Sequence, residues 1–192
     1  MTEGELLEAL RARGAIMSGH FRLSSGRHSD TFLQKFRLFE DAALTLRVGD
    51  MLAHKFPGGF DVVAAPAIGA IVLGFATAAA KGARSIFSER VDGQMTFRRG
   101  FDIRAGERVL VVEDVITTGG SAAQVVELVT SLGARVQGVG ALVDRLDASR
   151  QALAAPLRSL ITLKATSWAP DDCPLCEAGV PLDDPGSRRL RA

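Results

Sequence analysis

The sequence predicts an α/β protein built on a parallel sheet that is covered by helices on both faces. Two observations carry this prediction. Short apolar runs that suit buried strands alternate along residues 61–143 with longer segments that suit helices, as in right-handed strand–helix–strand units. A chain of 192 residues with 47% hydrophobic content can also enclose one substantial core. We therefore expect a single domain over residues 1–192.

Most of the elements have a local signal in the sequence. Thr2 and Glu5 form a capping box that begins the first helix, and Gly14 ends it. Residues 15–37 show no clear period, although 31–36 look extended. The segment from 146 onward is rich in Ala and then in Pro, and we expect it to be accessory. The elements between them are expected as a helix over 41–56, a strand over 61–65, a helix over 68–81, strands over 84–89 and 95–99, a strand over 109–112, a helix over 121–132 and a strand over 135–143.

A hairpin is expected around the Asp92–Gly93 pair, which is favoured in a two-residue turn. The hairpin has few obvious apolar anchors and carries three cations, Arg90, Arg98 and Arg99. These are the features of a lid that closes over an anionic ligand. Arg90, at the base of the hairpin, is the strongest functional candidate. For Arg98 or Arg99 alone, a solvated surface charge is an equally good interpretation.

Composition excludes several classes of protein. The net charge is +1 and no block of like charges occurs, so neither nucleic acid nor an anionic membrane is indicated as a partner. The longest apolar run, residues 68–80, is too short and too rich in Gly and Ala to span a bilayer. The acidic N-terminus is typical of a mature soluble helix and not of a signal peptide. We therefore expect a cytoplasmic protein.

Residues 109–121, Val-Leu-Val-Val-Glu-Asp-Val-Ile-Thr-Thr-Gly-Gly-Ser, are the most informative stretch. A buried strand ends in two acids, and a turn of small residues then opens a helix. Ligands bind outside the carboxyl ends of strands in such a sheet, and free N–H groups at a helix N-terminus bind phosphate. The turn has no Lys, so it is not a nucleotide P-loop. It offers three hydroxyl groups and two glycines that let the backbone approach closely: Thr117, Thr118, Ser121, Gly119 and Gly120.

Glu113 and Asp114 place two carboxylates beside this phosphate-binding turn. Carboxylates suit that position if they accept hydrogen bonds from sugar hydroxyls or help to hold a divalent cation. A ribose 5-phosphate meets all of these demands. The alternative is a buried strand, an acidic loop and an ordinary helix N-cap.

The stretch resembles the signature by which type I phosphoribosyltransferases bind phosphoribosyl pyrophosphate (PRPP). Residues 21–29, Phe-Arg-Leu-Ser-Ser-Gly-Arg-His-Ser, resemble the N-terminal segment of the orotate phosphoribosyltransferases. The resemblance also covers Pro66-Ala67, Glu89-Arg90, Arg98-Arg99-Gly100-Phe101, Val143-Asp144-Arg145 and the Cys-Pro-Leu-Cys tail. It implies a transferase that converts orotate and PRPP into orotidine 5′-monophosphate and pyrophosphate in pyrimidine (UMP) biosynthesis.

The family resemblance also assigns roles to individual residues. It implies a type I phosphoribosyltransferase fold with a PRPP-binding core over 41–145, a hairpin lid, and a hood made by 1–40 and about 146–192. Asp114 and Arg90 are the expected catalytic residues, and Mg²⁺ is expected to be held mainly through PRPP, near Glu113 and Asp114. A homodimer that shares lid residues between its two sites is expected. PRPP is expected to contact Arg90, Glu113, Asp114, Val115, Ile116, Thr117, Thr118, Gly119, Gly120 and Ser121, and orotate is expected to contact Thr117, Arg145 and Phe32.

Two positions depart from the family pattern. Many family members carry Lys where this chain has Ser24 and again where it has Gly69, and both lysines would face pyrophosphate or the base. This chain must therefore gather positive charge from other residues.

Cys173 and Cys176 form a single Cys-Pro-Leu-Cys pair, whereas zinc normally takes four ligands. The three histidines, at positions 20, 28 and 54, are far from the pair in the sequence. We interpret the pair as a tight structural turn, with a zinc site shared across a dimer axis as the alternative.

Two rival functions use the same signature. A purine or xanthine salvage phosphoribosyltransferase would keep residues 109–121 but would not need residues 21–29 or Arg145. A non-catalytic regulator that senses PRPP and acts on nucleic acid should carry a helix-turn-helix or a basic face, and neither is evident in residues 1–60.

Overall fold

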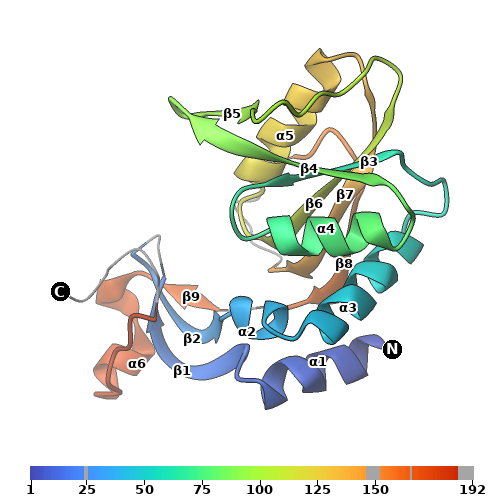
Figure 1. Ribbon diagram of the computed structural model, residues 1–192. Helices are drawn as coiled ribbons and strands as arrows, with labels where there is room; N and C mark the ends of the chain where they lie inside the picture. The colour runs from blue at the N-terminus through green and yellow to red at the C-terminus, as the bar shows by residue number, and fades with distance from the viewer. Residues whose placement is uncertain (24–25, 146–151, 165, 186–192) are drawn as a thin grey trace.

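The computed structural model describes residues 1–23, 26–145, 152–164 and 166–185, and a six-stranded sheet forms its centre (Figure 1). The strand order is β5-β4-β3-β6-β7-β8. All neighbouring pairs are parallel except β4 with β5, which form an antiparallel hairpin at one edge. The strands are β3 (Val62–Pro66), β4 (Arg84–Val91), β5 (Gln94–Phe97), β6 (Arg108–Ile116), β7 (Arg135–Asp144) and β8 (Leu157–Thr162).

Helices cover both faces of this sheet, as predicted (Figure 1). Alternate residues of β6 divide between two apolar clusters because successive side chains of a strand point to opposite faces. Leu110 and Val112 pack in the cluster that contains α1 (Glu3–Ala12), α3 (Ala42–His54) and α4 (Ile71–Ala79). Val109 and Val111 pack in the other cluster, with α5 (Gly120–Ser131). The α/β prediction is therefore confirmed.

The helix starts follow the sequence signals. The hydroxyl of Thr2 accepts a hydrogen bond from the Glu5 N–H, and the Glu5 carboxylate accepts one from the Thr2 N–H, which completes the capping box of α1. The Asp41 carboxylate accepts a hydrogen bond from the Leu44 N–H and caps α3.

A second, three-stranded sheet lies beside the central one (Figure 1). Its order is β1-β2-β9, and all neighbouring pairs are antiparallel. It brings together residues from the two ends of the chain, as the expected hood does. The elements of this region are β1 (Ile16–Arg22), β2 (His28–Leu33), α2 (Phe36–Phe39), β9 (Ser167–Trp168), the 3₁₀ turn η1 (Pro170–Asp172) and α6 (Pro174–Glu177).

Three features of the fold were not foreseen. Strand β1 was missed because it is irregular, with a β-bulge between Ser18 and Phe21. The stretch 31–36, expected to be extended, ends its strand at Leu33, and α2 begins at Phe36. Strand β8, which lies in the segment expected to be accessory, is the sixth strand of the central sheet.

The hairpin of β4 and β5 has the predicted two-residue turn, with Asp92 at φ 47° and Gly93 at φ 83°. It is better anchored than the sequence suggested. Met95 is buried in the same apolar cluster as α5, and Phe97 packs against that cluster. Mobility is therefore expected mainly at the turn.

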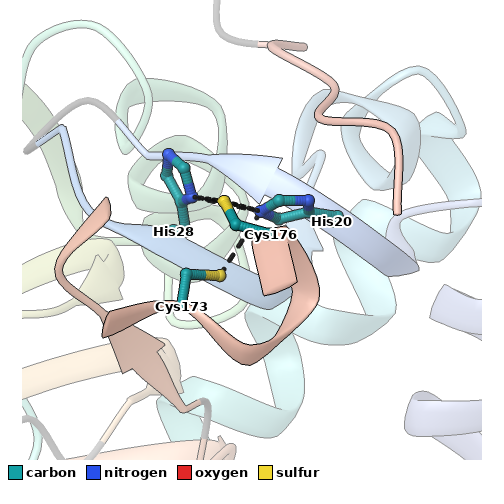
Figure 2. A group of neighbouring side chains, drawn as sticks. All are labelled: His20, His28, Cys173 and Cys176. Carbon is teal, nitrogen blue, oxygen red and sulfur yellow. Dashed lines mark hydrogen bonds between the residues drawn. The ribbon is translucent and has the colours of Figure 1, made fainter. Parts of the chain in front are cut away.

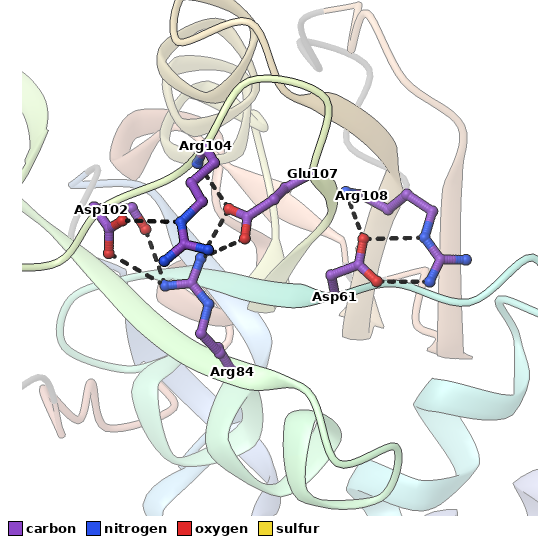
Figure 3. A network of polar contacts seen from close by, with 6 residues as sticks. All are labelled: Asp61, Arg84, Asp102, Arg104, Glu107 and Arg108. Atoms are coloured by element: carbon purple, nitrogen blue, oxygen red, sulfur yellow. Dashed lines mark hydrogen bonds and ion pairs between the residues drawn. The ribbon is translucent and has the colours of Figure 1, made fainter.

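The amino ends of β3, β4 and β6 carry a network of surface ion pairs (Figure 3). The Arg108 guanidinium lies 2.6 Å from the Asp61 carboxylate, and Arg84 contacts both Glu107 (2.8 Å) and Asp102 (3.3 Å). These pairs tie the loops that lead into the strands to one another.

Within the described residues, no helix is long and apolar enough to cross a membrane.

Candidate active site

A hollow opens at the carboxyl end of β6, where the sequence predicts a phosphate-binding turn. Among the residues that the structure describes, those that surround it all come from the signature. Eight of the ten residues expected to contact PRPP line this one hollow: Glu113, Val115, Ile116, Thr117, Thr118, Gly119, Gly120 and Ser121.

The turn presents backbone N–H groups to the hollow. Gly119 is the N-cap of α5 and has φ 78°, a left-handed conformation that glycine adopts without the strain of a Cβ. No described side chain caps α5, so the N–H groups of its first turn need another hydrogen-bond acceptor. Thr117 and Thr118 are exposed beside these groups. This arrangement suits a phosphate.

Glu113 and Asp114 are both buried, with 9% and 4% of their surfaces exposed. Burial, reinforced by the neighbouring charge of Asp114, raises the pKa of Glu113 well above its ordinary value. The Val115 N–H donates to Asp114 Oδ1 (2.6 Å), but Asp114 Oδ2 accepts no hydrogen bond from any described residue. The Lys35 ammonium compensates the charge of this oxygen, which keeps hydrogen-bonding capacity that a ligand can use. Asp114 therefore marks a ligand-binding position.

Lys35, which the sequence reasoning missed, lies against Asp114. Its Nζ is 2.5 Å from Asp114 Oδ2, an ion-pair contact that lacks the angles of a hydrogen bond. A Cβ built on Gly69 would collide with this same carboxylate oxygen and would lie 2.5 Å from Lys35 Nζ. Lys35 thus occupies the space that a side chain at position 69 would need. The sequence offered one clue: position 69 lacks the family's lysine, and a lysine, Lys35, stands just after the strand that carries Phe32.

Arg145 follows β7 directly, and its N–H donates to the carbonyl of Ile116 (3.0 Å). The arginine backbone is therefore fixed next to the hollow, because Ile116 lines it. Phe32 is half-buried on β2, where its ring is 5.7 Å from that of Phe21. It does not line the hollow, but Lys35 follows it by three residues and contacts Asp114, so the end of β2 approaches the site.

The three lid arginines differ in their contacts. Arg90 donates to Gln124 Oε1 (2.9 Å) on α5, close to the signature turn. Arg99 pairs with Glu89 (2.9 Å), and this pairing lowers the pKa of Glu89. Arg98 is exposed, and its side chain makes no hydrogen bond or ion pair with any described residue, although its carbonyl accepts from the Phe101 N–H (3.0 Å).

Solved structures that match this fold include phosphoribosyltransferases. The orotate phosphoribosyltransferase of Aeropyrum pernix matches with a TM-score of 0.71 and 29% identity over 83% of this chain and 94% of that one. The Mycobacterium tuberculosis orotate phosphoribosyltransferase, solved in complex with inorganic phosphate, matches with a TM-score of 0.66 and 28% identity over 84% and 95%. The fold and the signature hollow therefore define a protein of the phosphoribosyltransferase class.

Sequence relatives narrow the class, although no family model matches the chain. The orotate phosphoribosyltransferase of Caldanaerobacter subterraneus is 47% identical over 191 residues, which cover 99% of this chain and 100% of that protein. That of Thermotoga maritima is 45% identical over 186 residues, or 96% and 98% of the two chains. The chain belongs to the orotate phosphoribosyltransferase family, and the predicted resemblance is confirmed.

Proposed function

We propose that this chain transfers ribose 5-phosphate from PRPP to orotate, giving orotidine 5′-monophosphate and pyrophosphate in UMP biosynthesis. We further propose that it acts in the cytoplasm as a homodimer. The observation that carries the proposal is Asp114, a buried carboxylate whose Oδ2 accepts no described hydrogen bond and which stands beside a turn suited to phosphate. A ribose ring with two hydroxyls and a 5-phosphate would satisfy both groups at once.

PRPP is expected to lie along the signature. The 5-phosphate would accept hydrogen bonds from the N–H groups of Gly119, Gly120 and Ser121 and from the hydroxyls of Thr117 and Thr118. The ribose hydroxyls would donate to Asp114 and Glu113. Lys35, held beside Asp114, would supply the positive charge that family members place at position 69.

The two buried carboxylates also fit Mg²⁺, because oxygen ligands are what this ion prefers. Asp114 Oδ2 and Glu113 are the residues that would hold the ion or its water shell, with PRPP supplying most of its ligands. When bound, Mg²⁺ would neutralise charge on the pyrophosphate leaving group.

In the proposed reaction, the bond from ribose C1 to the pyrophosphate oxygen breaks and a bond from C1 to a ring nitrogen of orotate forms. Positive charge develops on the sugar and negative charge on pyrophosphate, so positioning and charge stabilisation supply most of the catalysis. Arg90 is the candidate for closing over the pyrophosphate. The attacking ring nitrogen loses its proton as the bond forms, and the pyrophosphate leaving group, itself a base, takes it, so we assign no side chain as a general base.

Orotate differs from uracil by a carboxylate, and Arg145 is the proposed partner of that group. A guanidinium can bind a carboxylate through two parallel hydrogen bonds. The Arg145 backbone is held beside Ile116 at the mouth of the hollow, which supports this role. Thr117 and Phe32 are the other proposed contacts of the base.

The test is an assay of pyrophosphate release by purified protein with PRPP and Mg²⁺, and with orotate, uracil, hypoxanthine, xanthine or adenine as the acceptor. We expect turnover with orotate alone, and we expect Arg145→Ala to raise the KM for orotate roughly 30-fold or more, since a lost charge pair costs about 2 kcal/mol or more. Turnover with a purine would identify a salvage enzyme. PRPP binding without turnover of any base would favour the PRPP-sensing regulator.

The shared lid is tested by mixing inactive variants. Asp114→Asn and a lid variant, Arg90→Ala or Arg98→Ala, are dissociated together and reassociated. If the lid cation acts on the partner's site, each hybrid dimer regains one intact site, and activity returns to roughly a quarter of wild type. Hybrids that stay inactive for both arginines would show that the lid serves its own chain.

A further inference from the structure

Four side chains that the proposed reaction does not use meet at one point in the small sheet: His20, His28, Cys173 and Cys176 (Figure 2). Their nearest nitrogen and sulfur atoms all lie within 4.8 Å of one another. Histidines expected to be remote from the cysteine pair are in fact its neighbours. The expectation that no further ligands lie near the pair within one chain is therefore wrong, whereas the tight turn and a metal shared across a dimer axis stay predictions.

Four of the distances within this cluster are close to those of a tetrahedral metal site. His20 Nε2 lies 3.1 Å from His28 Nδ1 and 3.5 Å from Cys173 Sγ. Cys176 Sγ lies 3.7 Å from His20 Nε2 and 3.3 Å from His28 Nδ1. Zinc bonds of about 2.0–2.1 Å to nitrogen and about 2.3 Å to sulfur, at tetrahedral angles, place the ligand atoms roughly 3.3–3.8 Å apart. One ion at the centre could therefore bind all four atoms after only small shifts.

The backbone aims each pair of ligands at this point. The bulge in β1 shifts the register so that Phe21, not His20, faces Ser29, and Arg22 faces His28. An extra residue of this kind moves the side chain of His20 to the face that His28 occupies. On the other side, Cys173 is the N-cap of α6 and Cys176 lies one turn later, so both thiols reach the histidines (Figure 2).

The surroundings of the cluster favour metal binding over a chance meeting of polar groups. His20 Nδ1 donates to the carbonyl of Val180 (2.8 Å), so Nε2 is the ring nitrogen that is directed at the other three ligands. Such an outer hydrogen bond is typical of metal-binding histidines. His20, His28 and Cys173 are at most 4% exposed. Two thiolates and one divalent cation would make the cluster electrically neutral, as burial requires.

We propose that His20, His28, Cys173 and Cys176 form a structural zinc site. Soft thiolates combined with imidazoles in a tetrahedral, closed set favour zinc over the oxygen-seeking magnesium of the active site. The proposal is independent of the reaction at the signature, because none of the four residues lines that hollow.

The site joins parts of the chain that share little apolar packing. His20 and His28 come from β1 and β2, whereas both cysteines lie in residues 166–185, of which none belongs to either apolar cluster of the described core. Segments too small to bury a core of their own are commonly held by a metal. Zinc would thus fix the C-terminal segment against the strand that carries Phe32.

The test is the metal content of the protein, expressed without a histidine tag and freed of loosely bound ions. We expect about one zinc per chain in the wild type and in the control His54→Gln, whose histidine lies on α3, and less than about a tenth of that in Cys173→Ser and Cys176→Ser. Cobalt-substituted protein should show thiolate-to-cobalt charge-transfer bands and the intense visible bands of a tetrahedral site. Removal of the metal should lower Tm in the wild type and not in Cys176→Ser.

If a cysteine variant does not fold, X-ray absorption of the wild type still reads the ligands directly, and about two sulfurs at 2.3 Å and two nitrogens at 2.0 Å are expected. The proposal is overturned by folded wild-type protein that binds no zinc when zinc is supplied, or by a Cys173–Cys176 disulfide in its place. It is also overturned by iron as the bound metal, or by zinc content that both cysteine variants retain.

Discussion

The amino ends and the carboxyl ends of the strands in the central sheet, here called the amino edge and the carboxyl edge, both carry charged residues. These residues are exposed at the amino edge and buried at the carboxyl edge. At the amino edge, Asp61 and Arg108 are each about 44% exposed at the side chain and paired at 2.6 Å, and the surrounding charges also have partners (Figure 3). At the carboxyl edge, Glu113 and Asp114 are buried side by side, and Lys35 is the cation that contacts Asp114 within the described part of the chain. The carboxylates of the first set accept hydrogen bonds from arginine, whereas Asp114 Oδ2 in the second set contacts Lys35 but accepts no hydrogen bond from a described residue.

This difference in burial distinguishes surface ion pairs with a structural role from buried carboxylates with a functional role. Exposed ion pairs contribute little to stability, because water solvates both partners well in their absence. Two adjacent buried carboxylates lower the stability of the fold, and such a loss is expected where the residues have a functional role. The predictions below exploit this contrast, from the largest expected effect to the smallest.

Asp114→Asn should lower kcat/KM for PRPP by roughly 100-fold or more, the loss seen when one preorganised polar group of an active site is removed. The fold should survive, because asparagine has the same shape and removes a buried charge. Steady-state kinetics with PRPP as the varied substrate, alongside a thermal melt, measure both quantities. Unchanged kinetics would show that the buried carboxylate does not bind substrate.

Lys35→Met should raise the KM for PRPP about tenfold, equivalent to a lost charge contact of about 1.4 kcal/mol. Lys81→Met, which removes an exposed lysine after α4, is the matched control and should leave KM unchanged. Gly69→Ala should also impair PRPP use, since its Cβ would collide with the Asp114 carboxylate. An equal effect of the two lysine variants on the KM for PRPP would show that Lys35 does not take part in PRPP binding.

Glu113→Gln should stabilise the protein while reducing its activity. The pKa of Glu113 is raised above its ordinary 4.5, so its ionisation destabilises the folded state, and stability is lost as the pH rises from that value through the raised pKa. Glutamine removes this loss, and we expect the variant to be more stable at neutral pH by roughly 0.5–2 kcal/mol. Denaturant titrations of both proteins at pH 4 and pH 7, without PRPP, test this. A variant less stable than the wild type at pH 7 would contradict it.

Asp61→Asn at the opposite edge should have the smallest effect. Hydrogen bonds from Arg108 lower the pKa of Asp61 from 3.8 to about 2, so its contribution is present above the higher value and is lost as the pH falls through the lower one. At neutral pH we expect a small fall in Tm and unchanged kinetics. A large loss of activity would mean that the amino edge takes part in function.

The central sheet and the phosphate turn could be predicted because their signals are local. The apolar run of β6, its two acids and the small residues after them are consecutive, so one stretch of sequence defines strand, site and helix start. Neighbouring positions in the chain are neighbours in the site. This is why eight of the expected PRPP residues line one hollow.

The features that were missed depend on contacts between distant residues. Lys35 and Asp114 meet only because the end of β2 crosses to the carboxyl edge of the sheet. His20 and Cys173 meet because a bulge in β1 turns one side chain and the C-terminal segment returns to β1. Neither the bulge nor the return of the C-terminal segment to β1 produces a periodic pattern in the sequence. The four metal-ligand candidates therefore looked unrelated.

The comparison of the two edges is tested most directly by hydrogen exchange of the whole protein with and without PRPP and Mg²⁺. Bound phosphate would accept hydrogen bonds from the backbone N–H groups of the signature turn, and amides that hydrogen-bond a ligand exchange more slowly. We predict strong protection of residues 113–121 and none of residues 102–108 at the amino edge. Protection confined to the amino edge, or none at the signature in the presence of saturating PRPP, would contradict the account.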